Sequence, residues 1–256
     1  MIPHIIPPLT GASVLVTRPQ PQADALAQSI AALGGEPIVF PAIAIEPLAT
    51  QAPQPHDWVL FASVHAVQFG APLISRTDVT RIVAIGKATA SALAAANMPA
   101  DVVANPPYTS EALLAQADFR TAPGQSVLIV RGEGGRELLR ETLTARGVRV
   151  QILEVYRRVR PQVSPAEIEA LETRWSELPI DAVTATSVET YRNLVELLTP
   201  RGRKLLNETP LLAPSRRIVD AAAAAGWRGQ ALVTNGADDA AIVGTLARWL
   251  TRARCD

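Results

Sequence analysis

Short apolar runs alternate along the whole chain with segments in which apolar residues recur every three or four positions. The runs SVLVTRP (13–19) and SVLIVRG (126–132) have the pattern of buried strands. Each is followed by an amphipathic helical pattern, over residues 24–33 and 137–146, and each pattern ends at a glycine. Repeated alternation of strand and helix predicts an α/β fold with parallel sheets covered by helices on both faces.

Two stretches of the chain repeat nearly the same phrase, DWVLFASVHAV (57–67) and DAVTATSVETY (181–191). Both pass from an acid through an apolar strand and small residues to Ser-Val and the start of a helical pattern. Further pairs of similar segments are 81–97 with 210–226 and 101–117 with 231–247. The chain is therefore predicted to contain two copies of one β/α series, offset by roughly 110–130 residues.

Two long, extended segments interrupt this alternation, EPIVFPAIAIEPL (36–48) and VRVQILEVYRRVRP (148–161). Both are edged by proline, and both are longer than a connection between helix and strand needs to be. Each holds either a strand plus a surface loop or a strand that connects two lobes. The segment AQADFRTAPG (115–124) offers another boundary, between two contiguous domains. The residues alone leave these alternatives open.

Composition narrows the class of protein. The chain has 256 residues, of which 48% are hydrophobic, enough for one large domain or two small ones. Equal numbers of basic and acidic residues, 24 of each, disfavour a general nucleic-acid or anionic-membrane partner. The single cysteine, Cys255, excludes a disulfide within the chain and fits a reducing cytosol. Without a signal-peptide pattern or an apolar run that could span a bilayer, we expect a cytoplasmic protein with a frayed first dozen residues.

Common catalytic and metal-binding motifs are missing. The three histidines, His4, His56 and His65, do not have the spacing of metal ligands, so no metal site is expected. No G-x-S-x-G motif surrounds Ser63 or Ser187, which disfavours an α/β-hydrolase. His65 follows Ser63 by two residues, and we expect it at the surface rather than in the role of a general base.

The segment RGEGGRE (131–137) has the form of a glycine-rich turn from strand to helix. Glu137 stands where a dinucleotide-binding fingerprint requires glycine, so that motif is not matched. Free backbone N–H groups at a helix start, with Arg131 and Arg136 beside them, suit an anionic group such as a carboxylate.

Several other predicted strand ends combine small hydroxyl residues, glycines and cations. They are Thr17-Arg18, Ser63, Gly86-Lys87, Ser187 and Ser215-Arg216-Arg217. One such serine alone would be explained as a helix N-cap. Because ligands of open α/β sheets bind at the carboxyl ends of the strands, the recurrence of these turns in both copies favours a cleft between lobes that binds many anionic groups.

Several phrases of the chain together resemble the uroporphyrinogen-III synthase family over residues 13–247. They are VLVTRPQPQADALAQSIAALGGEPIVFPAIAIEP, DWVLFASVHAVQF, VAIGKATASAL, VLIVRGEGGRELLRETLTARGVRVQILEVYRRVRP and DAVTATSVETYRNL. Each motif alone is only a turn from strand to helix. Their order and spacing, with VYRR near residue 156, make the combination specific.

The chain departs from the family pattern at one turn. Near the helix start of the second copy the family commonly has a glycine and then a threonine, as Gly86 and Thr89 stand in the first copy. Here the corresponding stretch, APSRRIV, has Ser215 and Ile218. A contact from this turn would therefore come from Ser215 or from Arg216.

The resemblance implies two flavodoxin-like α/β lobes, each a parallel sheet flanked by helices, joined by a two-stranded connector. It implies a discontinuous first lobe, from residues 1–40 and 163–256, and a second lobe from residues 41–162. The two extended segments, near 36–48 and 148–161, are then the crossings between lobes.

The resemblance also implies a lyase of tetrapyrrole biosynthesis that converts linear hydroxymethylbilane to cyclic uroporphyrinogen III with loss of water. The last pyrrole ring is inverted through a spiro intermediate, and neither a metal nor an organic cofactor takes part. A monomer without nucleic-acid or membrane partners is expected. The many carboxylates of this substrate account for repeated anion-binding turns in a chain of zero net charge.

The resemblance and the strand-end pattern together select the candidate site residues. The expected substrate-binding residues are Thr17, Arg18, Ser63, Gly86, Lys87, Thr89, Arg131, Ser187, Ser215 and Arg216. The substrate also cyclises spontaneously without inversion, so the enzyme's task is mainly one of positioning.

Tyr156 is the candidate catalytic residue, as proton donor to the departing hydroxyl. Strict alternation along ILEVYRRV puts Ile152, Glu154 and Tyr156 on one face, the more polar one, where a tyrosine faces the cleft. A half-buried aromatic residue that stiffens the connector is the structural alternative.

A non-catalytic, two-lobed cytosolic protein that binds a small molecule is the alternative function. It would use the same repeat, cleft and hinge.

Overall fold

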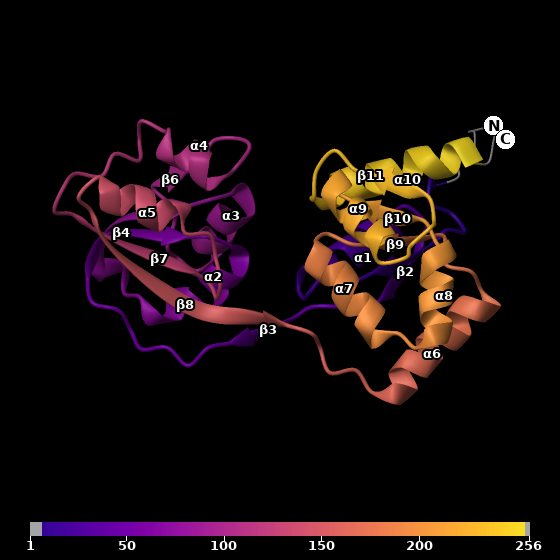
Figure 1. The fold of residues 1–256 in the computed structure, drawn as a ribbon. Helices are drawn as coiled ribbons and strands as arrows, with labels where there is room; N and C mark the ends of the chain where they lie inside the picture. Colours follow the sequence, from indigo (N-terminus) through magenta and orange to yellow (C-terminus); the bar gives the residue numbers. More distant parts are fainter. Residues whose placement is uncertain (1–6, 254–256) are drawn as a thin grey trace. The chain divides into compact units, whose positions relative to one another are not determined.

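The computed structural model describes residues 7–253, and these form two compact units (Figure 1). The first unit takes its residues from Met1–Ala44 and Val159–Asp256, and the second is Ile45–Arg158. The chain therefore passes between the units inside the two long extended segments noted in the sequence. Segment 115–124 lies within the second unit, where Phe119 packs edge-on against Trp58 at 5.3 Å between ring centroids.

The first unit is built on a five-stranded parallel sheet in the order β11-β10-β9-β1-β2. Its strands are β1 (Ser13–Val16), β2 (Glu36–Val39), β9 (Ala182–Thr184), β10 (Leu211–Ala213) and β11 (Ala231–Val233). Because β1 pairs with β9, the start of the chain belongs to the same sheet as its C-terminal part (Figure 1).

Helices cover both faces of this sheet. One face carries α1 (Gln22–Ala32) and α10 (Asp239–Ala253), and the other carries α6 (Pro165–Glu177), α7 (Val188–Leu197), α8 (Pro200–Glu208) and α9 (Arg216–Ala224). Val14 and Val16 pack in the cluster with α1 and α10, whereas Leu15 packs on the opposite face. Burial on both faces explains why these strands are continuous apolar runs in the sequence.

The second unit is built on a six-stranded sheet in the order β3-β8-β7-β4-β5-β6. Its strands are β3 (Ala44–Pro47), β4 (His56–Phe61), β5 (Val79–Ala84), β6 (Val102–Val103), β7 (Ser126–Gly132) and β8 (Arg149–Val159). One face packs on α2 (Val64–Gly70) and α3 (Lys87–Ala95), and the other on α4 (Ser110–Leu114) and α5 (Leu138–Ala145). Two short 3₁₀ turns, Ala71–Leu73 and Arg76–Asp78, connect α2 to β5.

The same polar contact joins two neighbouring strands in each unit. The Asp181 carboxylate accepts the backbone N–H of Ser13 at 2.7 Å and its hydroxyl at 3.2 Å. In the second unit the Asp57 carboxylate accepts the N–H of Ser126 at 2.7 Å and its hydroxyl at 2.8 Å. These bonds from Ser126 hold the pKa of the Asp57 carboxyl below its ordinary value. Both contacts tie the amino-terminal ends of adjacent strands together.

The prediction of a frayed first dozen residues is wrong for residues 7–12. Leu9 is fully buried in the cluster that contains Ile30, and its N–H donates to the carbonyl of Leu33 at 2.9 Å. A single leucine among prolines has no periodicity that would have revealed this packing. Residues 1–6, which include His4, lie outside the described residues, as does Cys255.

The hydroxyl of Tyr191, on α7, is buried without a hydrogen-bond partner among the described residues. The side chain is 1% exposed, and burial raises the pKa of the phenol to about 12. We expect Tyr191→Phe to leave the free energy of unfolding at neutral pH unchanged, or to raise it by up to about 1 kcal/mol.

The stabilities of the wild type and of Tyr191→Phe should diverge at alkaline pH. The pKa of Tyr191 in the folded protein lies above its ordinary value of 10.0. The stability that comes from keeping this phenol neutral is therefore complete below pH 10 and is lost as the pH rises towards 12. The Phe variant should avoid that loss, about 2–3 kcal/mol when complete. Urea unfolding of both forms across this pH range measures the difference. A clear loss of stability in the Phe variant at neutral pH would contradict an unpaired hydroxyl.

Candidate active site

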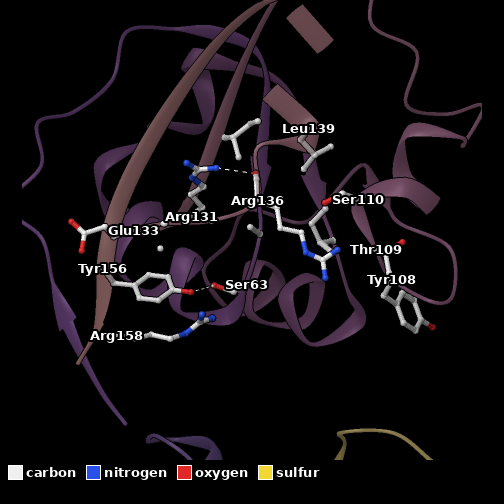
Figure 2. A pocket seen from close by; sticks show the side chains of 16 residues that line it. Ser63, Tyr108, Thr109, Ser110, Arg131, Glu133, Arg136, Leu139, Tyr156 and Arg158 are labelled. Atoms are coloured by element: carbon white, nitrogen blue, oxygen red, sulfur yellow. Dashed lines mark hydrogen bonds between the residues drawn. The ribbon is translucent and has the colours of Figure 1, made fainter. Parts of the chain in front are cut away.

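A pocket of about 470 Å³ opens in the second unit, where the strands of its sheet end (Figure 2). Its wall combines Ser63 after β4, the loop 108–110 after β6, the turn 131–136 at the end of β7, and Tyr156 and Arg158 on β8. This is the edge at which open α/β sheets bind ligands.

Tyr156 and Ser63 form a hydroxyl pair in this pocket, with 3.0 Å between Tyr156 Oη and Ser63 Oγ (Figure 2). Ser63 is the N-cap of α2, and its Oγ accepts the N–H of Ala66 at 3.1 Å. The proton of the serine hydroxyl can therefore be donated to Tyr156 Oη. In that arrangement the phenol proton stays available for a group bound in the pocket.

Strict alternation along β8 wrongly placed Tyr156 on the same face as Glu154. The register against β7 shifts here: Arg131 lies opposite Glu154, but the next residue, Gly132, lies opposite Tyr156. Val155 is the extra residue of this bulge, and bulges re-aim side chains. Val155 and Tyr156 consequently pack in one apolar cluster with α2, while Glu154 contacts Arg131.

His65 was expected at the surface, and this prediction is also wrong. The residue is 8% exposed, and its ring lies 5.4 Å from the ring of Tyr156. The bulge explains the difference, because it turns Tyr156 toward α2 and covers the first turn of that helix.

Gly132 provides the space that the Tyr156 ring occupies. A Cβ atom on Gly132 would lie 2.6 Å from Tyr156 Cζ and 2.7 Å from its Cε2, closer than Cβ atoms approach other groups. The backbone at Gly132 is not left-handed, so this glycine is needed for steric reasons.

Arg131 is surrounded by partners of its own chain. Its guanidinium contacts Glu137 at 2.8 Å and Glu154 at 3.2 Å, donates to the carbonyl of Arg136 at 3.0 Å, and the residue is 8% exposed. The hydrogen bond from Arg131 lowers the pKa of the Glu137 carboxyl. In this structure Arg131 holds the turn 132–137 in place.

Gly86, Lys87 and Thr89 lie at the neighbouring strand end. Gly86 is the N-cap of α3, and Thr89 is buried in the first turn of that helix. The Lys87 ammonium lies 5.9 Å from the ring centroid of Tyr108, a residue of the pocket wall. The structure thus brings Ser63, Arg131 and Tyr156 to one pocket, with Lys87 next to its wall.

The first unit holds the remaining predicted turns, those at Ser187 and Ser215. Ser187 is the N-cap of α7 and lines a hollow of about 520 Å³ together with Arg192 and Arg217. Ser215 is the N-cap of α9 without a side-chain capping bond, and Arg216 is exposed and pairs with Asp220 at 3.1 Å.

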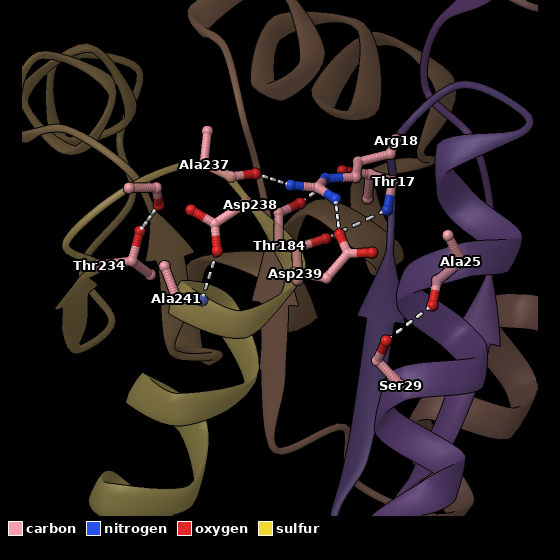
Figure 3. Close-up of polar contacts among 11 residues, drawn as sticks. Thr17, Arg18, Ala25, Ser29, Thr184, Thr234, Ala237, Asp238, Asp239 and Ala241 are labelled. Atoms are coloured by element: carbon pink, nitrogen blue, oxygen red, sulfur yellow. Dashed lines mark hydrogen bonds and ion pairs between the residues drawn. The ribbon is translucent and has the colours of Figure 1, made fainter. Parts of the chain in front are cut away.

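Thr17 and Arg18 are buried and bonded within the first unit (Figure 3). The Thr17 hydroxyl donates to the carbonyl of Thr184. The Arg18 guanidinium pairs with Asp239 at the start of α10 and donates to the carbonyl of Ala237. Both side chains connect β1 to neighbouring elements of their own unit.

Tyr108 and Arg158 are among the pocket residues that sequence reasoning missed. Tyr108 has a left-handed backbone, with φ of 60°, in a loop without regular periodicity. Arg158 belongs to the VYRR motif, but the motif does not reveal which face of the strand each arginine occupies.

Within residues 7–253, no group of three or more His, Cys, Asp and Glu side chains could hold a metal ion. Nor does any helix there have the length and apolar character needed to cross a membrane.

A family model described as uroporphyrinogen-III synthase HemD matches residues 24–240. The chain belongs to the uroporphyrinogen-III synthase family. A uroporphyrinogen-III synthase of Salmonella typhimurium is 35% identical over 248 residues, which cover 89% of this chain and 97% of that protein. One from Escherichia coli K12 is 34% identical over 243 residues, with the same two coverages. The prediction of a uroporphyrinogen-III synthase, an enzyme of tetrapyrrole biosynthesis, is confirmed by these matches.

Solved structures of the family share the fold. The uroporphyrinogen-III synthetase of Helicobacter pylori matches with a TM-score of 0.60 at 12% identity, covering 93% of this chain and 99% of its own. A mutant uroporphyrinogen III synthase of Thermus thermophilus matches with a TM-score of 0.55 at 20% identity, covering 96% and 100%. The predicted α/β fold with two mostly parallel sheets flanked by helices is confirmed.

Proposed function

We propose that this chain binds hydroxymethylbilane and cyclises it to uroporphyrinogen III in the pocket of the second unit. The hydroxyl pair of Tyr156 and Ser63, at the strand-end pocket of a uroporphyrinogen-III synthase family member, is the observation that carries this proposal.

In the proposed reaction Tyr156 donates its proton to the departing hydroxyl. The C–O bond breaks, its electron pair leaves with the oxygen as water, and the pyrrole nitrogen stabilises the remaining carbon cation. That carbon is attacked by the substituted carbon of the terminal ring. This attack forms the spiro intermediate. The bond from the attacking ring carbon to its original methylene then breaks, and that methylene bonds to the free α-carbon of the same ring, which inverts the ring. The α-carbon releases its proton as the ring regains its aromatic form, this proton restores the tyrosine, and the net change is the loss of one water. Proton donation of this kind contributes about 10²–10⁴-fold.

The remaining candidate residues are proposed to position the substrate's carboxylates. They are Ser63, Gly86, Lys87, Thr89 and Arg131 of the second unit, and Thr17, Arg18, Ser187, Ser215 and Arg216 of the first. Arg18 and Arg131 already pair with carboxylates of the chain, so we propose that these two act indirectly, by holding the turns that carry the other binding groups. The proposal includes a monomeric, cytosolic enzyme without a metal or organic cofactor.

The proposal also includes two lobes that are copies of one β/α series, residues 1–40 with 163–256 and residues 41–162. The matching serine–aspartate contacts support it, since Ser13 with Asp181 and Ser126 with Asp57 occupy corresponding strands. The sheet orders β11-β10-β9-β1-β2 and β6-β5-β4-β7-β8 correspond in the same way.

The reaction is tested by adding the protein to hydroxymethylbilane and separating the product isomers by chromatography. Uroporphyrinogen III is the expected product. Formation of only uroporphyrinogen I, the spontaneous isomer, would overturn the proposal. Tight binding of the substrate without isomer III would favour the non-catalytic binding protein instead.

A further inference from the structure

Arg131 and Arg136, the other arginines of the pocket wall, each lie near a carboxylate of the chain, whereas no carboxylate of the described chain neutralises Arg158. It lines the pocket and is exposed, and within residues 7–253 its guanidinium forms no hydrogen bond or ion pair. By contrast, the pocket's Arg131 is enclosed by Glu137 and Glu154.

Comparison with the neighbouring arginine shows that the lack of a partner is specific to position 158. Arg157 lies next to Arg158 on β8, and its guanidinium contacts the Glu46 carboxylate at 3.0 and 2.8 Å. Arg157 does not line the pocket. Two adjacent arginines of one strand therefore have different surroundings, one paired with a carboxylate of the chain and the other unpaired at the pocket.

The direction of the Arg158 side chain indicates its ligand. In Figure 2 its guanidinium points toward the hydroxyl pair of Tyr156 and Ser63. A guanidinium presents a planar fork of donors that fits a carboxylate with two parallel hydrogen bonds. A carboxylate bound here would lie beside the group that we propose as proton donor.

A second cation of the pocket is only weakly paired. The Arg136 side chain is 75% exposed, and its nearest carboxylate oxygen, on Glu111, lies 3.6 Å away. Exposed pairs at this separation contribute little, so the guanidinium can exchange Glu111 for a ligand.

We propose that Arg158 binds a carboxylate on the pyrrole ring that loses its hydroxyl, and that Arg136 binds a second carboxylate of the same substrate. Arg131 is then a positioning residue that shapes the turn carrying Arg136. The inference rests on the proposed function, because it assigns the ligands of that site. In this arrangement Arg158 contributes to binding of the substrate, and Tyr156 acts on the departing hydroxyl.

The test compares Arg158→Gln with the matched variant Arg157→Gln in the isomer assay. Both remove one positive charge from adjacent positions of β8. Loss of a charged hydrogen-bond pair to substrate should raise KM by about tenfold or more in Arg158→Gln. Because the carboxylate is held before and during the reaction, kcat should change much less than KM. Arg157→Gln should change KM by less than about twofold.

A second pair of variants tests the other arginine. Arg136→Gln should raise KM. The matched control is Arg140→Gln, which removes an exposed arginine of α5 that pairs with Glu137, and it should leave KM unchanged. Arg131→Gln should instead lower the melting temperature, because it leaves the Glu137 and Glu154 carboxylates without their shared partner. The melting temperature of Arg158→Gln should equal that of the wild type.

The outcomes separate this inference from the proposed function. If the wild type makes no uroporphyrinogen III, the proposed function fails and this inference fails with it. If the wild type is active and Arg158→Gln has an unchanged KM, only the inference is overturned. Equal increases of KM in Arg158→Gln and Arg157→Gln would also overturn it, because they would reflect net charge and no specific contact.

Discussion

Tyr156→Phe should lower kcat by about tenfold or more, which corresponds to about 1.4 kcal/mol in the activation barrier. The substitution keeps the ring that packs against His65 and Phe69 and removes only the hydroxyl beside Ser63. A phenyl ring cannot protonate the departing hydroxyl, whereas the apolar contacts that stabilise the fold are retained. Steady-state kinetics with separation of the product isomers, together with a melting curve, measure both effects.

Tyr108→Phe is the matched control for this variant. Tyr108 also lines the pocket, and within residues 7–253 its hydroxyl forms no hydrogen bond. We therefore expect its kcat to stay within about threefold of the wild type, a change of less than 1 kcal/mol in the barrier. Full activity of Tyr156→Phe, with uroporphyrinogen III as product, would eliminate Tyr156 as the proton donor. If Tyr156 has only a structural role, Tyr156→Phe should keep the kcat of the wild type, and Tyr156→Ala should have a lowered melting temperature.

Gly132→Ala should reduce kcat at least as far as Tyr156→Phe and should also destabilise the fold by about 1–3 kcal/mol. The added methyl would lie 2.6 Å from Tyr156 Cζ, so either the ring or the bulged strand must move. Any such movement separates Tyr156 Oη from Ser63 Oγ. Kinetics and urea unfolding of the same preparations measure the two losses.

Two comparisons isolate the steric cause. Gly244→Ala, on α10 in the first unit, adds a methyl whose nearest neighbour is 3.4 Å away at the end of the Arg248 side chain, and it should not destabilise the protein. In a double-mutant cycle, Tyr156→Ala removes the ring and should abolish most of the destabilisation caused by Gly132→Ala. Additive losses in that cycle would show that the glycine acts independently of Tyr156.

Predictions from local pattern were accurate where the cause is local. The strand–helix alternation located β1, β7, α1 and α5 to within a few residues, because burial on both faces imposes continuous apolar runs on strands. Ser63 and Ser187 cap the first turns of α2 and α7, as the position of a serine before a helical pattern predicts. The family predicted from the order and spacing of these turns is confirmed by the family model that matches residues 24–240.

The details of the candidate site depended on residues far apart in sequence. Whether β1 pairs with β9 or with β4 is a choice between distant partners, and the residues alone left a contiguous division open. The bulge at Gly132 and Tyr156 arises from the pairing of two strands, so periodicity within β8 alone predicted the wrong face.

The sequence by itself determined the α/β class, the strand-end turns and the presence of hydroxyl groups and cations at them. The tertiary structure alone decided which of these groups remain available for a ligand. Arg131 and Arg158 are both arginines near strand ends, yet Arg131 is neutralised by Glu137 and Glu154 while Arg158 stays unpaired among the described residues. Ion pairing depends on which carboxylate the fold brings within about 4 Å, and a linear pattern of charges does not contain that distance.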